Sequence, residues 1–425
     1  MSDATAPVGA RTPMLAADGR PLKASLARAL RAQKLKALML IAPLLVFVLV
    51  TFLFPIGDML LRSVQNQIVP QTLPKTVAAL QGWDPAGSDL PEEAAFAALY
   101  DDLTVAVQEK SNTRLGSRLN YEYSGFSSLM RKSGRDVAKM DASQPFKDQF
   151  IAADKSWGQL GVWQTIKLFS GNYTAGYLLN AVDMQLTPQG IALKAPEDRI
   201  YVKLFLRTMA MSLAITFLCF LLGYPIAYLL SVLPMRSSNL LLILVLLPFW
   251  TSLLVRTASW KVLLQQQGVI NNVLVWLGIV DDANRLALIN NATGTMIAMT
   301  HILLPFMILP LYSVMKTIPP SYLRAAKSLG ANDWTAFWRV YFPQSIPGVG
   351  AGAILVFILA IGYYITPELV GGTTGVFISN RIAYHISTSL NWGLAAALAT
   401  LLLLVVLALY YTYDRIVGID NVKLG

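Results

Sequence analysis

Six apolar stretches, each close to the length that crosses a membrane, constrain the fold of this chain more than any other feature. A transmembrane helix needs about 20 mostly apolar residues. The stretches lie at residues 38–61, 204–233, 240–255, 295–314, 349–365 and 392–411. The third is short and ends at Arg256, so its outer boundary stays open. We therefore expect an all-α polytopic membrane protein with six transmembrane helices.

The composition agrees with this fold class. Hydrophobic residues make up 55% of the 425 residues, charged residues make up 14%, and the mean hydropathy is +0.52. Soluble domains carry roughly 25% charged residues. The first stretch is too long for a secretory signal, and residues 52–55 offer no small-residue cleavage site. We expect it to remain as an uncleaved span.

Basic residues gather before the first stretch and predict the orientation of the chain. Residues 1–37 carry seven basic and two acidic side chains, and such flanks stay in the cytoplasm. Six crossings return residues 416–425 to the same side, where Arg415 and Lys423 agree with it. We expect both termini to be cytoplasmic.

The segment at 62–200 falls outside the cytoplasm by the same count of crossings. It holds 15 acidic and 14 basic residues, so the positive net charge of the chain lies elsewhere. Residues 91–110 open with a proline and two glutamates before an apolar-periodic run, which predicts an amphipathic helix. Further helices are expected at 144–153 and 163–169. The length suffices for a separate core, so we expect a mainly helical extracytoplasmic insertion domain.

Groups suited to catalysis are scarce in the sequence. Cys219 is the only cysteine, which excludes a disulfide framework and a thiolate metal site within this chain. His301 and His385 are the only histidines, they do not stand at metal-ligand spacing, and no phosphate-binding glycine loop occurs. For His301 we favour packing or hydrogen bonding over ligand binding. We expect no enzyme, no bound cofactor and no metal, with the energy for any transport coming from a partner.

The loop between the fourth and fifth stretches contains the start and stop residues of two short helices, which we expect to lie at an angle. Pro319 and the proline after it stop the preceding span. Ser321 is expected to cap a helix at 322–329, which Gly330 ends in a left-handed conformation. Asn332 and the aspartate after it then cap the second helix. Trp334 and two further aromatic residues argue against an ordinary solvated loop.

This loop resembles the EAA loop of permease subunits of ATP-driven (ABC) importers. The match consists of Ala325-Ala326, Gly330 four positions later, and the ending Val340-Tyr341-Phe342-Pro343, while Arg324 stands where the family has glutamate. The resemblance implies a cytoplasmic loop at 317–347 that docks on an ATPase. It assigns the coupling role to Tyr322, Arg324, Ala325, Ala326, Leu329, Gly330 and Pro343.

Four further segments resemble the spermidine/putrescine branch of these permeases. They are LGYPIAYLLS at 222–231, LPFWTSLLVRTASWKVLLQQQGVINNVL at 247–274, LPFMILPLYSVMK at 304–316 and GYYITPELVGG at 362–372. The resemblance implies the type I importer permease fold in a bacterial inner membrane. It also implies a second permease subunit, two copies of a cytoplasmic ATPase that bind ATP and Mg, and a periplasmic solute-binding protein, with membrane lipid around them and no nucleic acid.

These inferences divide the chain into consecutive parts. We expect a basic tail at 1–37, the first transmembrane helix at 38–61, the insertion at 62–200, the permease core at 201–415 and a second cytoplasmic tail at 416–425. The insertion is longer than is usual in the polyamine branch, so the resemblance assigns it no role.

A path for a cationic solute is expected near the outer ends of the third and fifth stretches. An ammonium group is attracted to aromatic faces and to a carboxylate. The candidates are Trp250, Thr251, Arg256, Trp260, Tyr363, Tyr364 and Glu368. The alternative is that these aromatic residues form an interfacial belt. Arg256 weighs against a purely cationic solute, unless it pairs with Asp281 or Asp282 or contacts the binding protein.

Three other functions stay open on the sequence alone. The first is import of an opine or an amino-acid-like solute, since related branches of the family handle such ions. A proton- or sodium-coupled carrier would need ionisable groups in the middle of its spans, which are almost uncharged here. A membrane sensor would use the insertion to bind a ligand, but it fits neither six spans nor the helical loop.

Overall fold

The computed structural model describes residues 22–417, which separate into two compact units at Leu61 and Arg62. In the first unit, α1 (Leu22–Val48) continues through the π-helical turn η1 (Leu49–Leu53) into α2 (Phe54–Arg62). The stretch Gln33–Arg62 is long and apolar enough to cross a membrane, and none of its most apolar window is buried.

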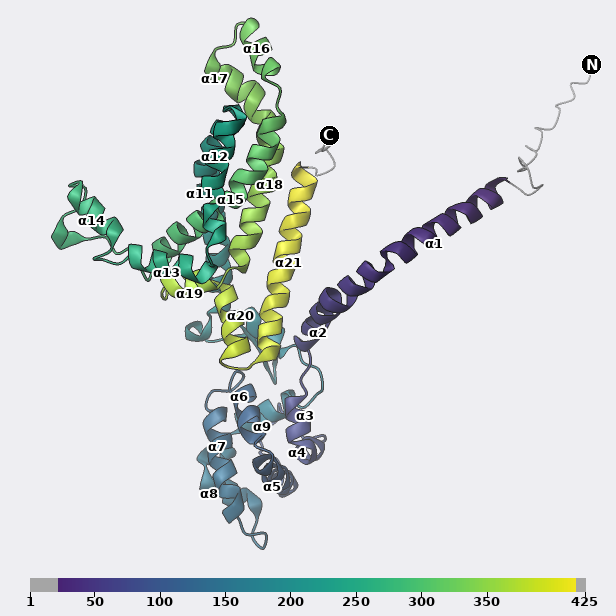
Figure 1. The fold of residues 1–425 in the computed structure, drawn as a ribbon. Helices are drawn as coiled ribbons and strands as arrows, with labels where there is room; N and C mark the ends of the chain where they lie inside the picture. Colours follow the sequence, from purple (N-terminus) through teal and green to yellow (C-terminus); the bar gives the residue numbers. More distant parts are fainter. Residues whose placement is uncertain (1–21, 418–425) are drawn as a thin grey trace, which may run out of the picture. The chain divides into compact units, whose positions relative to one another are not determined.

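The insertion forms the first part of the second unit and is mainly helical (Figure 1). Its helices are α3 (Ile68–Thr72), α4 (Pro74–Ala79), α5 (Glu93–Gln108), α6 (Asn112–Leu119), α7 (Phe126–Asp136), η2 (Val137–Lys139), α8 (Phe146–Ala153), η3 (Lys155–Gly158), α9 (Leu160–Leu168), α10 (Gly176–Ala181) and η4 (Pro196–Asp198). A small antiparallel hairpin of β1 (Met184–Thr187) and β2 (Gly190–Leu193) follows α10. The three helices expected from the sequence correspond to α5, α8 and α9.

Four aromatic side chains form the centre of a core that belongs to the insertion alone. Phe96 and Trp163 have ring centroids 4.5 Å apart, and Trp157 lies 5.4 Å from Trp163 and 5.5 Å from Phe150. The indole of Trp157 donates to Ser133 Oγ over 2.8 Å, so the burial of its N–H is compensated. All fully buried members of this cluster lie between residues 69 and 169. The insertion thus has the separate core that its length suggested.

The remainder of the second unit holds the other apolar helices. They are α11 (Tyr201–Val232), α12 (Met235–Leu246), η5 (Leu247–Trp250), α13 (Leu253–Leu263), α14 (Val269–Trp276), η6 (Asp282–Asn284), α15 (Ala292–Thr317), α16 (Pro320–Ser328), α17 (Asp333–Ala336), η7 (Phe337–Tyr341), α18 (Phe342–Gly362), α19 (Ile365–Val370), α20 (Ile378–Ser387) and α21 (Trp392–Val417). In the described part of the chain, five helices are long and apolar enough to cross a membrane, or six if one bent pair counts as a span.

A bundle of α11, α15 and α18 forms the core of this region (Figure 1). α15 lies in the middle, and half of its most apolar window is buried. Gly348 and Gly352 of α18 lie against Val314 and Met307 of α15, which brings the two backbones close together. At the other side of α15, Cys219 of α11 lies 3.5 Å from the Thr300 carbonyl oxygen.

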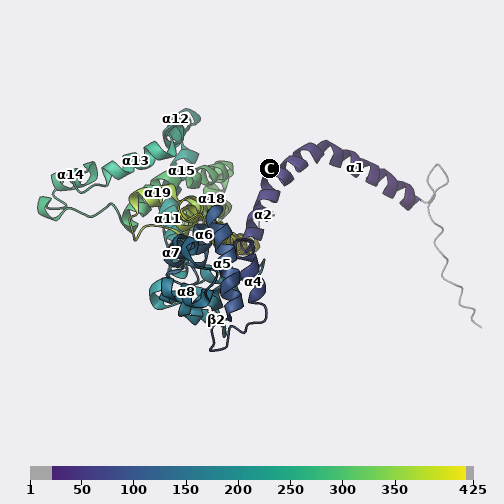
Figure 2. The same cartoon turned by 90° about the horizontal axis from the view of Figure 1, so that it is seen from below.

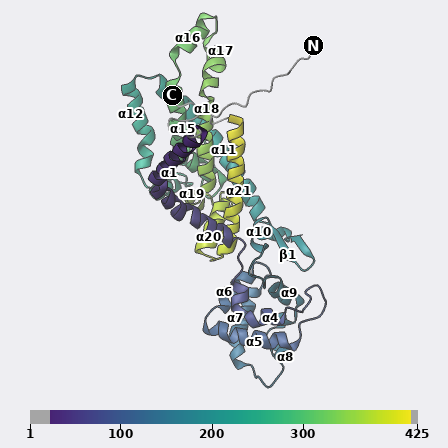
Figure 3. The ribbon, with the colours of Figure 1, turned by 90° about the vertical axis from the view of Figure 1, so that its right-hand side faces the viewer.

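The loop with α16 and the insertion lie at opposite ends of this bundle (Figure 3). Lys316, at the end of α15, donates to the Ser231 carbonyl at the end of α11, so these two helices run parallel. The insertion enters the bundle at the start of α11, and α16 follows the end of α15. This arrangement agrees with an insertion and a loop on different sides of a membrane.

The third apolar stretch is not the straight span that the sequence predicted. Met235–Trp250 and Leu253–Leu263 are bent by 95° at a short break. Pro248 lacks a backbone donor near the end of the first segment, and Ser252 starts the second by accepting a hydrogen bond from the Val255 N–H over 3.2 Å. Figure 2 shows α13 and α14 running outward from the bundle after this break.

Candidate functional site

The first helix of the predicted coupling loop, α16, begins two residues earlier than a cap at Ser321 would allow. Pro319 occupies the N-cap position and Pro320 the first helical position, where a missing N–H costs nothing. No side chain caps the helix, so the expected role of Ser321 as a cap is wrong.

Gly330 ends α16 in the left-handed conformation, as its position predicted. Its φ is 90°. The Ala331 N–H donates to the Ala326 carbonyl over 3.1 Å, and the Gly330 N–H donates to the Lys327 carbonyl over 3.0 Å. This pair of bonds is the Schellman motif, which satisfies the last carbonyls of a helix. The ammonium of Lys327 also pairs with Asp333 across the turn.

The second helix of the loop starts at the predicted cap but does not end as a short helix. Asn332 Oδ1 accepts from the Thr335 N–H over 2.8 Å. From Asp333 the chain stays helical to Gly362 over 30 residues, through the π-helical turn at 337–341. Pro343 lies inside this helix, and the wider π turn before it accommodates a residue that lacks an N–H. The expected pair of short helices is therefore one short helix and the extended start of α18.

A groove of about 550 Å³ lies between α16 and the start of this long helix. Four of the predicted coupling residues line it, namely Tyr322, Ala325, Ala326 and Leu329, whereas Arg324, Gly330 and Pro343 do not. The two alanines keep the groove wall low. Leu329 is 90% exposed and Trp334 is 72% exposed. Apolar exposure of this kind is typical of surfaces that contact a protein, a ligand or a membrane.

Arg256 forms hydrogen bonds to backbone carbonyls at the break in the third stretch. Its guanidinium donates to the Thr251 carbonyl over 3.0 Å and also to the Pro248 carbonyl. The Pro248 carbonyl also accepts from the Thr251 N–H over 3.3 Å, so Arg256 adds a bond to the 3-10 turn that ends this segment. Among the described residues Arg256 forms no ion pair with Asp281 or Asp282, and Asp282 pairs with Arg285 over 2.6 Å. The other alternative, a contact of Arg256 with the binding protein, stays a prediction.

Trp260 and His301 form a pair that links α13 to α15. The indole Nε1 of Trp260 donates to His301 Nδ1 over 3.0 Å, and the ring centroids lie 5.1 Å apart. The hydrogen-bonding role favoured for His301 is therefore present, and the sequence did not identify its partner.

The structure brings the ends of the third and fifth stretches together. Thr257 of α13 and Thr366 of α19 are buried with their hydroxyl oxygens 3.1 Å apart. Trp250 precedes the break and is 84% exposed. Among the described residues, no hydrogen bond or ring contact joins it to Tyr364 or Glu368. Trp250 is therefore not bonded to these residues of the fifth stretch, and the solute path stays a prediction.

Asn380 positions the two residues of the fifth stretch that suit a cation, and the sequence analysis missed it. Its Nδ2 donates to Glu368 Oε2 over 2.7 Å and to the Tyr364 carbonyl over 2.9 Å. Glu368 and Tyr364 remain exposed, whereas Asn380 is buried. No sequence signal identified these bonds, because only the packing of α20 against α19 brings Asn380 to residues 12 and 16 positions earlier in the chain. Within residues 22–417, no cluster of histidine, cysteine or acidic residues has the geometry to hold a metal.

Comparisons with known proteins place this bundle in a described family. Residues 208–417 match the model of the binding-protein-dependent transport system inner membrane component. The spermidine/putrescine transport system permease protein PotB of Salmonella typhimurium (strain SL1344) is 35% identical over 228 residues, which cover 54% of this chain and 79% of that protein. The inner membrane ABC transporter permease protein YdcU of Escherichia coli (strain K12) is 32% identical over 262 residues, covering 59% and 82%.

One chain in a solved structure of a bacterial alginate ABC transporter is also similar. That structure is a complex with an alginate pentasaccharide-bound periplasmic protein, and the alignment covers 53% of the present chain and 80% of the transporter chain. Its TM-score is 0.42 at 18% identity. The segment at 62–200 lies outside the residues that match the family model.

Proposed function

Because the chain belongs to the family of inner membrane components of binding-protein-dependent transport systems, we propose that it forms half of the translocation path of an ATP-driven importer for a polyamine-like cation. The other half is a second permease subunit, and a periplasmic binding protein delivers the solute. The relatives named as spermidine/putrescine permeases support this choice of solute.

The exposed groove beside α16 is the observation that carries the coupling part of this proposal. An apolar groove with a low alanine wall suits a helix-in-groove contact with a cytoplasmic ATPase. Two copies of that ATPase bind ATP and Mg, because this family supplies the membrane subunit and not the nucleotide site. The loop, both termini and the basic tail then lie in the cytoplasm, and the insertion lies in the periplasm.

Glu368 and Tyr364 support a path for an ammonium group. Both are exposed at the surface of this chain, and Asn380 fixes the carboxylate through one oxygen only. An aromatic face and a carboxylate each attract an alkylammonium ion. Arg256 donates to backbone carbonyls of the break through Nη2 alone, and its Nε is buried without a hydrogen-bond partner. Its positive charge therefore still weighs against a purely cationic solute.

Uptake by the reconstituted importer tests the solute and the path together. Proteoliposomes that hold this chain, its partner permease and the ATPase should take up labelled spermidine or putrescine when the loaded binding protein and ATP are present. Glu368→Gln keeps an oxygen for Asn380 and removes the charge, so we expect about tenfold slower uptake. Asp281→Asn, an exposed acidic residue elsewhere, is the matched control. Equal uptake by Glu368→Gln would remove this residue from the path, and transport of glutamate but no polyamine would overturn the solute.

A further inference from the structure

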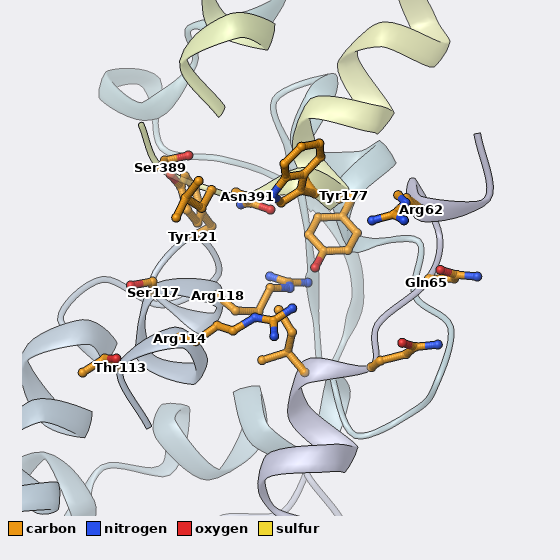
Figure 4. A pocket seen from close by; sticks show the side chains of 15 residues that line it. Arg62, Gln65, Thr113, Arg114, Ser117, Arg118, Tyr121, Tyr177, Ser389 and Asn391 are labelled. Carbon is orange, nitrogen blue, oxygen red and sulfur yellow. The ribbon is translucent and has the colours of Figure 1, made fainter. Parts of the chain in front are cut away.

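A pocket lies where the insertion meets the loop that joins α20 to α21, away from the groove and from the predicted solute path. Its volume is about 550 Å³, which is in the range of small-molecule sites. Figure 4 shows Arg114 and Arg118 extending from α6 toward Tyr177, with Asn391 on the α20–α21 loop above them. The four residues come from three separated parts of the sequence.

Arg118 is a buried cation with one edge unused. It is 3% exposed, and its Nη1 donates to Glu122 Oε1 over 2.6 Å. Its guanidinium carbon lies 4.1 Å from the centroid of the Tyr177 ring. Nε and Nη2 are buried without a hydrogen-bond partner. These two groups form the edge of arginine that binds a carboxylate or a phosphate through two parallel hydrogen bonds.

Glu122 does not fill this unused edge, because its oxygens are already engaged. Oε1 accepts from Arg118 Nη1, and both oxygens accept from Asn180 Nδ2 over 3.0 and 2.9 Å. The opposite charges of Arg118 and Glu122 therefore neutralise each other. Any acceptor for Nε and Nη2 of Arg118 must come from outside this set.

Asn391 presents a second unused donor on the wall of the same pocket. Its Oδ1 accepts from the Leu394 N–H over 3.2 Å and so caps α21, while its Nδ2 is buried without a partner. The residue is 8% exposed. The start of α21 is also the positive end of a 26-residue helix, which favours an anion.

Arg114 adds a positive charge at the mouth of the pocket. It lies one turn before Arg118 on α6 and is exposed, and within the described part of the chain it forms no ion pair. The lining thus includes the unpartnered edge of Arg118, the amide of Asn391 and the guanidinium of Arg114, beside neutral glutamine, serine, threonine and tyrosine side chains and no carboxylate. Burying unpaired donors of this kind is unfavourable unless a ligand satisfies them.

We propose that this pocket binds an oxyanion group, a carboxylate or a phosphate, carried by the headgroup of an anionic membrane lipid or by a free solute. The half-exposed Trp392 at the start of α21 also lines the pocket, and tryptophan at a span end is typical of the headgroup level of a membrane. The bound group joins the insertion to α21 through charge-assisted hydrogen bonds. This assignment is independent of the transported solute.

The test uses the full chain, purified with its partner subunits and stripped of lipid, and follows thermal unfolding. Phosphatidylglycerol is titrated against zwitterionic phosphatidylcholine, and inorganic phosphate and succinate are titrated separately. We expect saturable stabilisation by phosphatidylglycerol, by phosphate or by succinate. A shift with phosphatidylglycerol alone identifies a lipid headgroup, and a shift with the free anions identifies a free solute; either supports the proposal.

Two variants connect that stabilisation to the pocket. Asn391→Asp keeps the oxygen that caps α21 but places a negative charge in the pocket, and Arg114→Gln removes an exposed cation, so both should fold. We expect each to weaken anion binding about tenfold. Arg135→Gln, an exposed arginine of the insertion outside the pocket, should leave it unchanged. The proposal is overturned if no anion stabilises the protein, or if Asn391→Asp binds as tightly as the natural sequence.

Discussion

Gly330 ends α16 at a φ of 90°, which costs a residue with a side chain about 1–2 kcal/mol. No atom lies within 4 Å of the place where a Cβ would stand, so this backbone cost is the obstacle to substitution. We expect Gly330→Val to misdirect the start of α17 and to lower ATP turnover, stimulated by the loaded binding protein, about tenfold. Membrane insertion of the variant should stay normal.

Gly330→Asn is the matched control, because asparagine enters the left-handed region far more readily than valine. Its ATP turnover in the reconstituted complex should remain close to that of the natural sequence. Equal turnover of the valine variant would show that the turn does not act as a joint.

Arg324 stands on the same helix but outside the groove, which makes it a separate test of how the loop docks. Its side chain is exposed. We expect Arg324→Glu to be tolerated, with uptake close to the natural rate, because the groove itself is lined by other residues. Loss of uptake from an intact complex would reveal an acidic partner of Arg324 on the ATPase.

His385 links stability to pH at the base of the insertion. Burial, together with the nearby positive charge of Arg381, lowers the pKa of its imidazole to about 4. Nε2 contacts the Tyr201 hydroxyl at 3.0 Å, Nδ1 contacts Ser389 Oγ at 2.8 Å, and the rings of Tyr121 and Tyr384 pack beside it.

A pKa lowered in the folded state favours the neutral form, so stability is complete above the unfolded pKa of about 6.5 and falls as the pH drops toward 4. We expect the free energy of unfolding to decrease by about 2 kcal/mol between pH 7 and pH 5. Hydrogen exchange of the α20 amides measures the change. His385→Gln should lose most of this dependence, and an equally steep profile in that variant would assign it to other groups.

Single residues were predictable where their chemistry is local. Gly330 and Asn332 act as expected because a left-handed turn and a helix cap depend on the residue type and its immediate neighbours. The pairing of Arg256 and the partners of His301 and Asn380 were not predictable. Each of those bonds joins groups that only the bend or the packing of separate helices brings together.

At the scale of elements, the length of an apolar run predicted spans well. The stretches at 204–233, 295–314 and 392–411 correspond closely to α11, α15 and α21. The break after Trp250 was missed. A run of apolar residues does not show that the Arg256 side chain will hydrogen-bond to the Pro248 and Thr251 carbonyls where the helix bends. The fusion of α17 with α18 was missed because Pro343 indicates a helix end, whereas the π turn before it lets the helix continue.

The contact between α10 and α21 gives a prediction at this scale. A Cβ at Gly393 would overlap the ring of Tyr177, which also lies against the guanidinium of Arg118. We expect Gly393→Ala to force α10 away from α21 at a cost of about 1–3 kcal/mol. Faster proteolysis within 62–200 of the membrane-embedded protein measures the loosening. Gly82→Ala, where a Cβ meets nothing, is the control, and equal protease resistance of both variants would show that the contact yields without strain.

At the scale of the whole molecule, the insertion at 62–200 is an addition to the permease region, because the family model matches only residues 208–417. Its core is complete between residues 69 and 169, so it has the means to fold as a unit. Its charges are balanced, and the pocket at its base presents arginines, which repel a polyamine. These features favour an insertion that packs over the outer mouth of the permease pair and contacts the binding protein or the partner subunit.

Expression of residues 63–198 alone tests this role. We expect cooperative unfolding, association with the cognate binding protein or the partner permease, and no micromolar affinity for spermidine, putrescine or amino acids. A contact of this kind buries on the order of 1,600 Å² in total, which a domain of this length can supply. Solute binding by the isolated insertion at micromolar concentration would contradict the packing role, because the domain would then receive the solute itself before the path through the membrane.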